Sequence, residues 1–456
     1  MSLLGLREAA ILLVSLSALL YRYRIRRKSL SLPPGPPRLP FVGNALSIPT
    51  HYPQKYYKRL GDQFGSKILY LEAFGQPIVV LNSAKAGKDL LDRRSATYSS
   101  RPHMTMFLEM PRRIFAHMSG VVSEVSSWRY LMAYGFVASM IQSSSSLKRR
   151  FDIVTSAVAP GRFLVDVFPT LKHVPEWMPG AGFKSLARKW RQTVVQMAED
   201  SYAATLQTLN NGTALTSFLS ENMALQNEGP DEEISLNDLK RVAQQVYGAG
   251  FETTSVALIT FILAMLLYPD IQRRVQQELD SVVSTNRLPD FSDQPNLPYL
   301  SAVLKEVFRW NTPVPLGVPR ASTEDDIYEG YFIPKVLCFM MKSFSPTPRY
   351  SILKDGKLMT DIPLDPAESV SFGFGRRICP GIHLVHPILF LAAASILTLF
   401  DIVPEFDSDG NPIKVTPQFN SDSLTSEPLP FKCKFAPHDG RPIEHLLKEY
   451  LSADMI

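Results

Sequence analysis

Residues 372–381 read Phe372-Gly373-Phe374-Gly375-Arg376-Arg377-Ile378-Cys379-Pro380-Gly381, and they are the most informative ten residues of the chain. They contain one of only three cysteines, and the others, Cys338 and Cys433, lie far away along the chain. Three widely spaced cysteines form neither a disulfide framework nor the paired CxxC pattern of a zinc site, so the chain suits a reducing compartment. A lone cysteine is most often an inert core residue. The residues around Cys379 must therefore show whether it takes part in chemistry.

Most of the chain outside this stretch has helical spacing. The 456 residues are 45% hydrophobic and 20% charged, which excludes general disorder, and the 36 prolines follow no collagen-like period. Two β-rich runs, Ile68–Leu71 and Ile78–Asn82, flank a turn at Gly75. We therefore predict a mainly α protein with small β-sheets, an α+β fold. The predicted helices are residues 52–60, 84–94, 185–209, 235–268, 271–283, 297–310 and 383–400, and the tail from residue 404 is predicted to form short strands and loops.

The longest predicted helix begins with Ser235 and Asp238 in capping-box spacing and ends before Pro269. At about 1.5 Å per residue it is roughly 50 Å long, enough to cross a whole domain. Its second half, residues 256–268, is apolar on every side, which indicates either complete burial or a second membrane span. The apolar run is too short for a span, and this favours a central buried helix.

The formal charge of +5 resides entirely in residues 1–28, which contain six basic residues and one acid. The remainder has no net charge, so a nucleic-acid-binding surface is not indicated. Leu3–Tyr21 is apolar apart from Arg7, Glu8 and small polar residues, but its uninterrupted part, Ala9–Tyr21, is shorter than the ~20 residues of a full span. A cleaved signal peptide would carry its positive charges before the apolar part, whereas here five basic residues follow it. By the positive-inside rule we predict an N-terminal, single-pass transmembrane anchor with the body of the chain in the cytosol.

The ten residues quoted above resemble the cysteine loop of the cytochrome P450 family, whose pattern is FxxGxRxCxG. Its five fixed positions are occupied here by Phe372, Gly375, Arg377, Cys379 and Gly381. With average residue usage, such a match arises by accident with a probability on the order of 10⁻⁴ in a chain of this length. The resemblance implies the cytochrome P450 fold with haem b (heme b, iron protoporphyrin IX) as the cofactor. It also implies that Cys379 is the axial ligand of the iron, because a thiolate ligand donates electron density that favours O–O cleavage.

The resemblance assigns roles to the other positions of this loop. Gly375 lacks a Cβ and permits the close backbone approach that a thiolate needs. Gly381 lets the following helix pack against the porphyrin. Arg377 is a bidentate donor suited to a haem propionate, and Phe372 shields the sulfur side from water.

A second motif lies midway along the longest helix, where Ala249-Gly250-Phe251-Glu252-Thr253-Thr254 is similar to the oxygen-activation motif of the family. A glycine weakens a helix by roughly 1 kcal/mol relative to alanine, so Gly250 should have a use. The resemblance implies that Ala249 and Gly250 leave room beside the haem for dioxygen. Thr253 and Glu252 are then the catalytic pair that delivers protons. A packing helix merely interrupted by a glycine is the alternative.

A third motif, Glu306-Val307-Phe308-Arg309, has the ExxR spacing of an ion pair on one helix face. Residues 109–112 have the same spacing but contain a proline, which excludes a helix interior. By resemblance Glu306 and Arg309 form a structural pair that Arg349 joins. The loop after them, residues 314–318, lines the substrate pocket, and Arg320 reaches a haem propionate.

Two features depart from the family pattern. The family usually has a WxxxR helix that holds the haem propionates, but Trp128, Trp177, Trp190 and Trp310 are followed four positions later by Met132, Ala181, Val194 and Val314. Residues 344–350 resemble the FxPxRF element of the family with one extra residue. We hypothesise that both departures are faults of gene prediction or splicing, which sequencing of the expressed transcript tests.

The predicted organisation is a membrane anchor with a basic cytosolic flank (residues 1–28), a Pro-rich hinge (29–40) and a haem-thiolate monooxygenase domain (41–456). The cysteine loop and Pro428-Leu429-Pro430-Phe431-Lys432-Cys433 look like those of fungal microsomal members. The resemblance implies insertion of one oxygen atom from O2 into a small lipophilic substrate such as a terpenoid, a steroid or a polycyclic aromatic. Secondary metabolism and xenobiotic oxidation are both compatible with this chemistry. The chain contains no flavin or dinucleotide fingerprint, so electrons should come from NADPH through a membrane-bound cytochrome P450 reductase, with cytochrome b5 as a further partner, at the endoplasmic reticulum membrane. The alternatives are a catalytically impaired haem-binding protein and a haem-thiolate isomerase or dehydratase.

Overall fold

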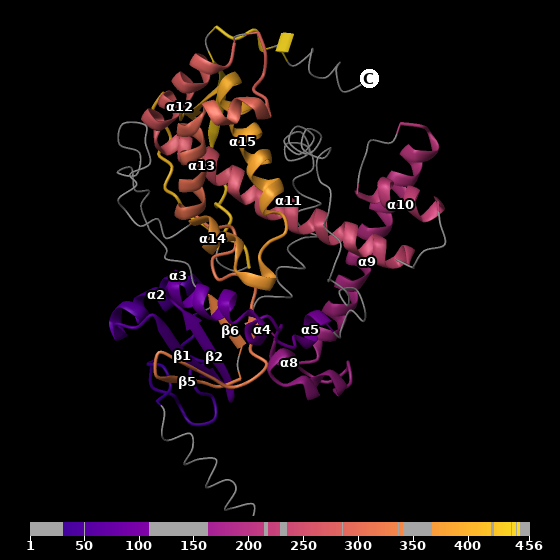
Figure 1. The fold of residues 1–456 in the computed structure, drawn as a ribbon, viewed down its shortest axis with the longest axis vertical. Coiled ribbons are helices and arrows are strands. Elements are labelled where there is room, and N and C mark those ends of the chain that lie inside the picture. Colours follow the sequence, from indigo (N-terminus) through magenta and orange to yellow (C-terminus); the bar gives the residue numbers. More distant parts are fainter. Residues whose placement is uncertain are drawn as a thin grey trace, which may run out of the picture. The chain divides into compact units, whose positions relative to one another are not determined.

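The computed structural model describes residues 31–49, 51–108, 163–213, 218–228, 235–284, 286–335, 337–340, 367–420, 424–438, 440–443 and 445–446 (Figure 1). The chain forms two compact units. Unit 1 comprises Met1–Pro49, Pro53–Pro102 and Pro319–Ser343, and unit 2 comprises Thr50–Tyr52, His103–Val318 and Phe344–Ile456. The predicted membrane anchor at residues 1–28 lies outside the described residues.

Unit 1 is built on a four-stranded sheet of order β1-β2-β6-β3. The β1–β2 hairpin turns at Gly75, whose φ of +77° is a conformation that glycine adopts without strain. The β2 strand pairs in parallel with β6, and β3 closes the sheet antiparallel to β6. The elements are α2 (Pro53–Phe64), β1 (Ile68–Ala73), β2 (Gln76–Leu81), α3 (Ala84–Gly87), the π-helix η1 (Lys88–Arg93), α4 (Ser95–Tyr98), β3 (Arg320–Ala321), β6 (Leu337–Met340), and the separate hairpin β4 (Asp326–Tyr328) and β5 (Tyr331–Ile333).

The helix predicted over residues 84–94 is divided into α3 and the π-helical η1. The turn begins at Ser83, whose side chain accepts a hydrogen bond from the backbone N–H of Ala86 and caps α3. Leu90 and Leu91 on η1 are buried. The wider π-helical turn therefore places both leucines in the core of unit 1.

The described part of the Pro-rich segment packs on unit 1. The backbone N–H of Tyr70 in β1 donates to the carbonyl of Pro34 at 3.0 Å, and that of Phe332 in β5 donates to Ser31 at 3.0 Å. A Cβ at Gly35 would lie 1.9 Å from the carbonyl oxygen of Tyr70, so only glycine fits there. Residues 31–35 are thus held against the two hairpins.

Unit 2 is mainly helical and carries one two-stranded sheet, β7–β8. Figure 1 shows α11 crossing this unit, with α12, α13 and α15 at one end and α9 and α10 at the other. The elements are α5 (Thr105–Leu108), α8 (Leu164–Val167), η2 (Pro169–His173), α9 (Gly182–Asn210), α10 (Phe218–Glu228), α11 (Leu236–Leu267), α12 (Pro269–Val282), η3 (Phe291–Asn296), α13 (Pro298–Trp310), α14 (Ala367–Phe372), η5 (Gly375–Arg377), α15 (Ile382–Leu399), β7 (Phe400–Pro404) and β8 (Cys433–Pro437).

The central helix α11 begins where its sequence signals place it. The Ser235 side chain accepts a hydrogen bond from the backbone N–H of Asp238 at 3.2 Å and donates to the Asp238 carboxylate at 2.8 Å. The second half of α11 is buried in one hydrophobic core with α12, α13 and α15, in which Phe261 and Phe390 are fully buried. Both α11 and α15 are long and apolar enough to cross a membrane. Their packing makes them core helices, as predicted for α11.

Candidate functional site

The cysteine loop closes on itself between α14 and α15. The backbone N–H of Cys379 donates to the carbonyl of Phe372 at 2.7 Å, and that of Ile378 donates to Gly375 at 3.0 Å. The loop turns through Gly373 and Gly375, whose φ angles are +81° and +55°. These angles lie in the left-handed region, which explains the two glycines. The backbone therefore holds Cys379 at a defined position before α15.

The Cys379 sulfur is half-buried among backbone groups. Burial raises the pKa of the Cys379 thiol, and a hydrogen bond from the backbone N–H of Gly381 lowers it in part. A Cβ at Gly381 would lie 3.7 Å from the sulfur, an ordinary contact, so the thiol alone does not require glycine there. A half-buried thiol with a backbone N–H donor beside it is suited to coordinate a cation, because a bound cation draws off the thiol proton and the donor stabilises the thiolate.

An aromatic cluster fixes the start of this loop. The Phe372 ring packs against Phe308 of α13 with centroids 5.3 Å apart and against His386 of α15 with centroids 5.2 Å apart. His386 also contacts Phe308 at 5.9 Å. Phe308 and His386 thus hold the Phe372 ring in place, and neither belongs to the FxxGxRxCxG pattern.

The outer side of the loop is exposed and mixed in character. Arg377 is exposed, and Ile378 exposes 50% of its surface although it is a large apolar residue. Haem combines an apolar ring with anionic propionates, so it would cover Ile378 and attract a guanidinium. With the half-buried thiol beside them, these residues fit a haem group.

The second motif lies on one continuous stretch of α11. The Thr253 hydroxyl donates to the carbonyl of Ala249 at 2.7 Å, which leaves its oxygen to accept. A Cβ at Gly250 would meet no described atom within 4 Å, so there is open space at this position. The Glu252 carboxylate accepts a hydrogen bond from the hydroxyl of Thr425 at 2.7 Å. The sequence carries no signal for Thr425, which is 173 residues away from Glu252 along the chain.

A buried polar network lies beside this bond. The Asn311 side chain, after α13, donates to the Thr260 hydroxyl at 3.1 Å and to the carbonyl of Ser426 at 2.7 Å. It accepts from the Ser426 hydroxyl at 2.8 Å. The residue exposures are 2% for Asn311, 0% for Thr260 and 4% for Ser426, so these bonds are shielded from water. The network attaches the segment between β7 and β8 (residues 405–420 and 424–432), here called the C-terminal segment, to α11 and α13.

Arg309, predicted as the structural partner of Glu306, and Arg320, predicted to reach a haem propionate, lie in different surroundings. In unit 2 the Arg309 Nε donates to Glu306 at 2.6 Å, and the two side chains are 16% and 14% exposed. The ExxR residues thus form a half-buried, two-bonded ion pair on α13. In unit 1 Arg320 is buried, and its guanidinium donates to the carbonyl of Leu91 at 3.3 Å. Arg349 lies outside the described residues, so its joining of the pair stays a prediction.

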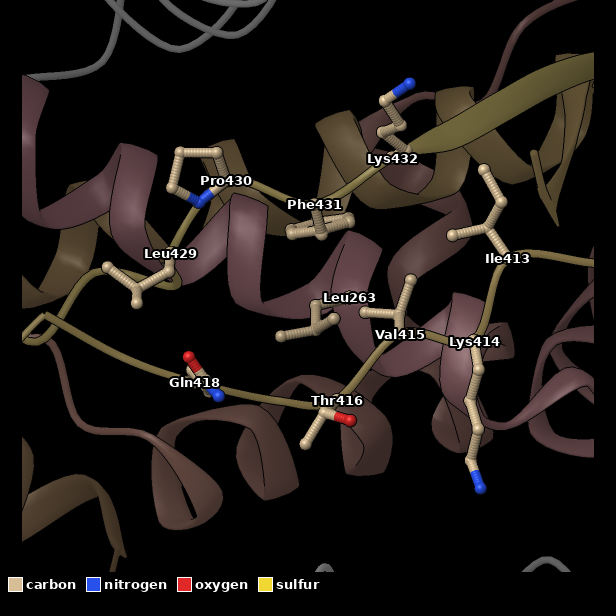
Figure 2. Close-up of a pocket in the computed structure, with 10 residues that line it drawn as sticks. All are labelled: Leu263, Ile413, Lys414, Val415, Thr416, Gln418, Leu429, Pro430, Phe431 and Lys432. Atoms are coloured by element: carbon tan, nitrogen blue, oxygen red, sulfur yellow. The ribbon is translucent and has the colours of Figure 1, made fainter. Parts of the chain in front are cut away.

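A hollow of about 270 Å³ separates α11 from the C-terminal segment (Figure 2). Leu263, Val415 and Phe431 face its interior, whereas Lys414 and Lys432 point away in opposite directions. None of the residues predicted from the motifs lines it.

Comparison with known proteins identifies the family. Residues 132–341 match the family model "Cytochrome P450". Over 91% of its length the chain is 35% identical to cytochrome P450 monooxygenase ple1 of Rhodocybe pseudopiperita, covering 91% of that protein. The chain belongs to the cytochrome P450 family. It is also 34% identical to cytochrome P450 monooxygenase COX1 of Coprinopsis cinerea (93% of this chain, 96% of the relative) and 32% identical to tryptamine 4-monooxygenase of Psilocybe cyanescens (91% and 94%).

These matches confirm the predicted family, its mostly helical fold with small sheets, and a monooxygenase enzyme. Membership implies a haem-thiolate cofactor and a redox partner. The alignment with the Rhodocybe cytochrome P450 runs over 482 positions, more than the 456 residues of this chain. The relative therefore contains residues without counterparts in this chain. Residues 109–146, where a WxxxR helix would be expected, lie outside the described residues.

Proposed function

We propose that this cytochrome P450 is a membrane-associated haem-thiolate monooxygenase that inserts one oxygen atom from O2 into a small lipophilic substrate. The observation that carries the proposal is the half-buried Cys379, held in a closed loop beside an exposed Ile378 and Arg377. Family membership supplies the reaction class.

Four residues of the loop would hold haem b. Cys379 would be the axial ligand of the iron, and Arg377 would pair with a propionate. Phe372 keeps water from the sulfur side, and Gly375 lets the backbone turn toward the sulfur. When bound, haem supplies the activation of dioxygen, and the thiolate ligand favours O–O cleavage. Arg320 remains our proposal for a second propionate contact.

Glu252 and Thr253 are proposed to deliver protons during the reaction. The Glu252 carboxyl can release a proton and regain one from water. The Thr253 hydroxyl, whose own proton is engaged by Ala249, can accept a hydrogen bond at its oxygen. The open space at Gly250 is on the same helix, within one turn of both residues. Ala249 and Gly250 therefore leave room where Glu252 and Thr253 act.

Membrane association is supported by an apolar segment in unit 2 as well as by the predicted anchor. In residues 164–178, Trp177 exposes 81% of its surface and Leu164 exposes 59%, and Phe168 and Met178 are also exposed. Tryptophan and leucine next to cations such as Lys172 are typical of residues at a lipid–water interface. We propose the endoplasmic reticulum membrane, with NADPH–cytochrome P450 reductase as the electron donor and cytochrome b5 as a further partner.

The substrate is proposed to be a terpenoid, a steroid or a polycyclic aromatic. The loop that the family resemblance assigns to the substrate pocket carries Val314, Leu316 and Val318. Val318 exposes 46% of its surface, so an apolar substrate would gain burial there.

The carbon monoxide difference spectrum of the reduced, membrane-expressed full chain tests the proposal. A red-shifted, thiolate-type Soret band that is lost in C379S, with an unchanged band in C433S, would support Cys379 as the ligand. A band typical of nitrogen-ligated haem, or no band, would refute it. The rise in NADPH consumption on addition of substrate, measured with reductase, then separates a monooxygenase from an impaired haem-binding protein or an isomerase, neither of which consumes NADPH in response to substrate.

A further inference from the structure

The bond between Thr425 and Glu252 joins the C-terminal segment to the oxygen-activation motif. Thr425 is 5% exposed, and its hydroxyl donates to one carboxylate oxygen of Glu252, Oε1, at 2.7 Å. A short bond from a buried hydroxyl to a carboxylate is stronger than a bond between two neutral groups. The two residues come from elements that no local pattern links, so only the tertiary structure brings them together.

The residue after Thr425 is bonded to the segment that follows α13, and through that segment to α11. The backbone N–H of Ser426 donates to the carbonyl of Pro313 at 2.9 Å. The Asn311 side chain makes two further hydrogen bonds to Ser426 and one to Thr260 of α11. Ser426, the residue next to Thr425, is therefore held through its backbone N–H, its carbonyl and its hydroxyl. These bonds fix the position of the Thr425 hydroxyl independently of its bond to Glu252. Such preorganisation removes the need to order the carboxyl during reaction.

A hydroxyl suits this position for a chemical reason. A lysine or arginine beside Glu252 would keep it as a permanent carboxylate, because a nearby positive charge favours the ionised form. A neutral hydroxyl donates to Oε1 whether the carboxyl carries its proton or has released it. Thr425 can therefore hold the carboxyl in one orientation through both protonation states, and it neither gives nor takes the transferred proton.

We propose that Thr425 is a positioning residue for proton delivery by Glu252, and that the Asn311–Ser426 hydrogen bonds set its place. This inference rests on the proposed monooxygenase function. It adds to the motif a residue from the far end of the chain, and it predicts that proton delivery slows when the hydroxyl alone is removed.

The test compares T425V, which removes the hydroxyl but keeps the shape, with T425S, which keeps the hydroxyl. The control is T398V, because the buried Thr398 hydroxyl has no hydrogen-bond partner among the described residues. The first readout is the infrared band of the Glu252 carboxyl, isolated as the difference between the wild type and E252Q. T425V should shift this band, whereas T425S and T398V should leave it in place.

The second readout is hydrogen peroxide released per NADPH oxidised, measured in membranes with reductase and without added substrate. Slower proton delivery should raise this ratio several-fold in T425V, and T425S should restore it. T425V should add nothing further in the E252Q background, because the two residues act as one unit.

The outcomes separate this inference from the proposed function. If the wild type shows no thiolate-type carbon monoxide band, the proposed function fails, and the inference falls with it. If the band is present but T425V leaves either the carboxyl band or the peroxide ratio unchanged, the positioning role of Thr425 is refuted while the proposed function stands.

Discussion

Replacement of Asn311 by leucine should destabilise unit 2 strongly. The change keeps the approximate size of the side chain but removes three hydrogen bonds, at 3.1, 2.7 and 2.8 Å. The Thr260 hydroxyl keeps its bond to the carbonyl of Val256 at 2.7 Å. The carbonyl and hydroxyl of Ser426 lose these bonds at a position that is 4% exposed. Each buried polar group deprived of its partner costs about 1–3 kcal/mol, so the loss at two groups should make N311L cost about 2–6 kcal/mol.

The thermal midpoint of the solubilised full chain measures this loss. With an unfolding entropy of about 2.1 cal/mol/K per residue, a chain of this length loses roughly 1 °C per kcal/mol. N311L should therefore lower the midpoint by about 2–6 °C. T398V removes a buried hydroxyl that has no partner among the described residues, and it should change the midpoint by less than about 1 °C.

A double-mutant cycle identifies the cause. S426A removes the hydroxyl that N311L deprives of its hydrogen-bond partner. The double variant should therefore lose less stability than the sum of the losses of the two single variants. The reasoning is refuted if N311L melts within about 1 °C of the wild type, or if the two losses add fully. Either result would mean that the Asn311 bonds do not tie the C-terminal segment to α11 and α13.

Three further predictions concern other parts of the chain. G250A should raise the thermal midpoint by roughly 1 °C, because alanine stabilises a helix by about 1 kcal/mol relative to glycine and its methyl group would enter open space. A lower midpoint would show that this space is filled. E306Q should lower the free energy of unfolding by about 1–3 kcal/mol, because it weakens the half-buried ion pair with Arg309. E176Q, which weakens the exposed pair with Arg188, should leave the thermal midpoint unchanged, and equal effects of the two changes would contradict this. The hydrogen bond from Tyr328, followed by that from Lys85, lowers the pKa of Asp89 below its ordinary value of 3.8. The ionised Asp89 therefore contributes its full stabilisation above pH 3.8, and this contribution is lost as the pH falls through the lowered pKa. D89N should therefore flatten the acid limb of a plot of unfolding midpoint against pH, and an unchanged limb would refute the linkage.

The helices and the first hairpin could be predicted from the sequence because their signals are local. The predicted helix at 297–310 corresponds to α13 (Pro298–Trp310), and the prediction at 185–209 corresponds to α9 (Gly182–Asn210). Ser235 before α11 and Gly75 between β1 and β2 mark ends and turns through their own backbone requirements. The cysteine loop could likewise be predicted, since its glycines and Cys379 lie within ten residues.

The sequence by itself therefore determined the family, the helical framework and the cysteine on which the proposed chemistry depends. Only the tertiary structure decided that β6 pairs with β2, that His386 packs on Phe372, and that Thr425 meets Glu252. The reason is the distance along the chain over which an interaction can be recognised as a sequence pattern. Caps, turns and hydrophobic periods act over a few residues, whereas the Asn311–Ser426 and Glu252–Thr425 pairs, 115 and 173 residues apart, form only when the packed core brings α11, α13 and the C-terminal segment together.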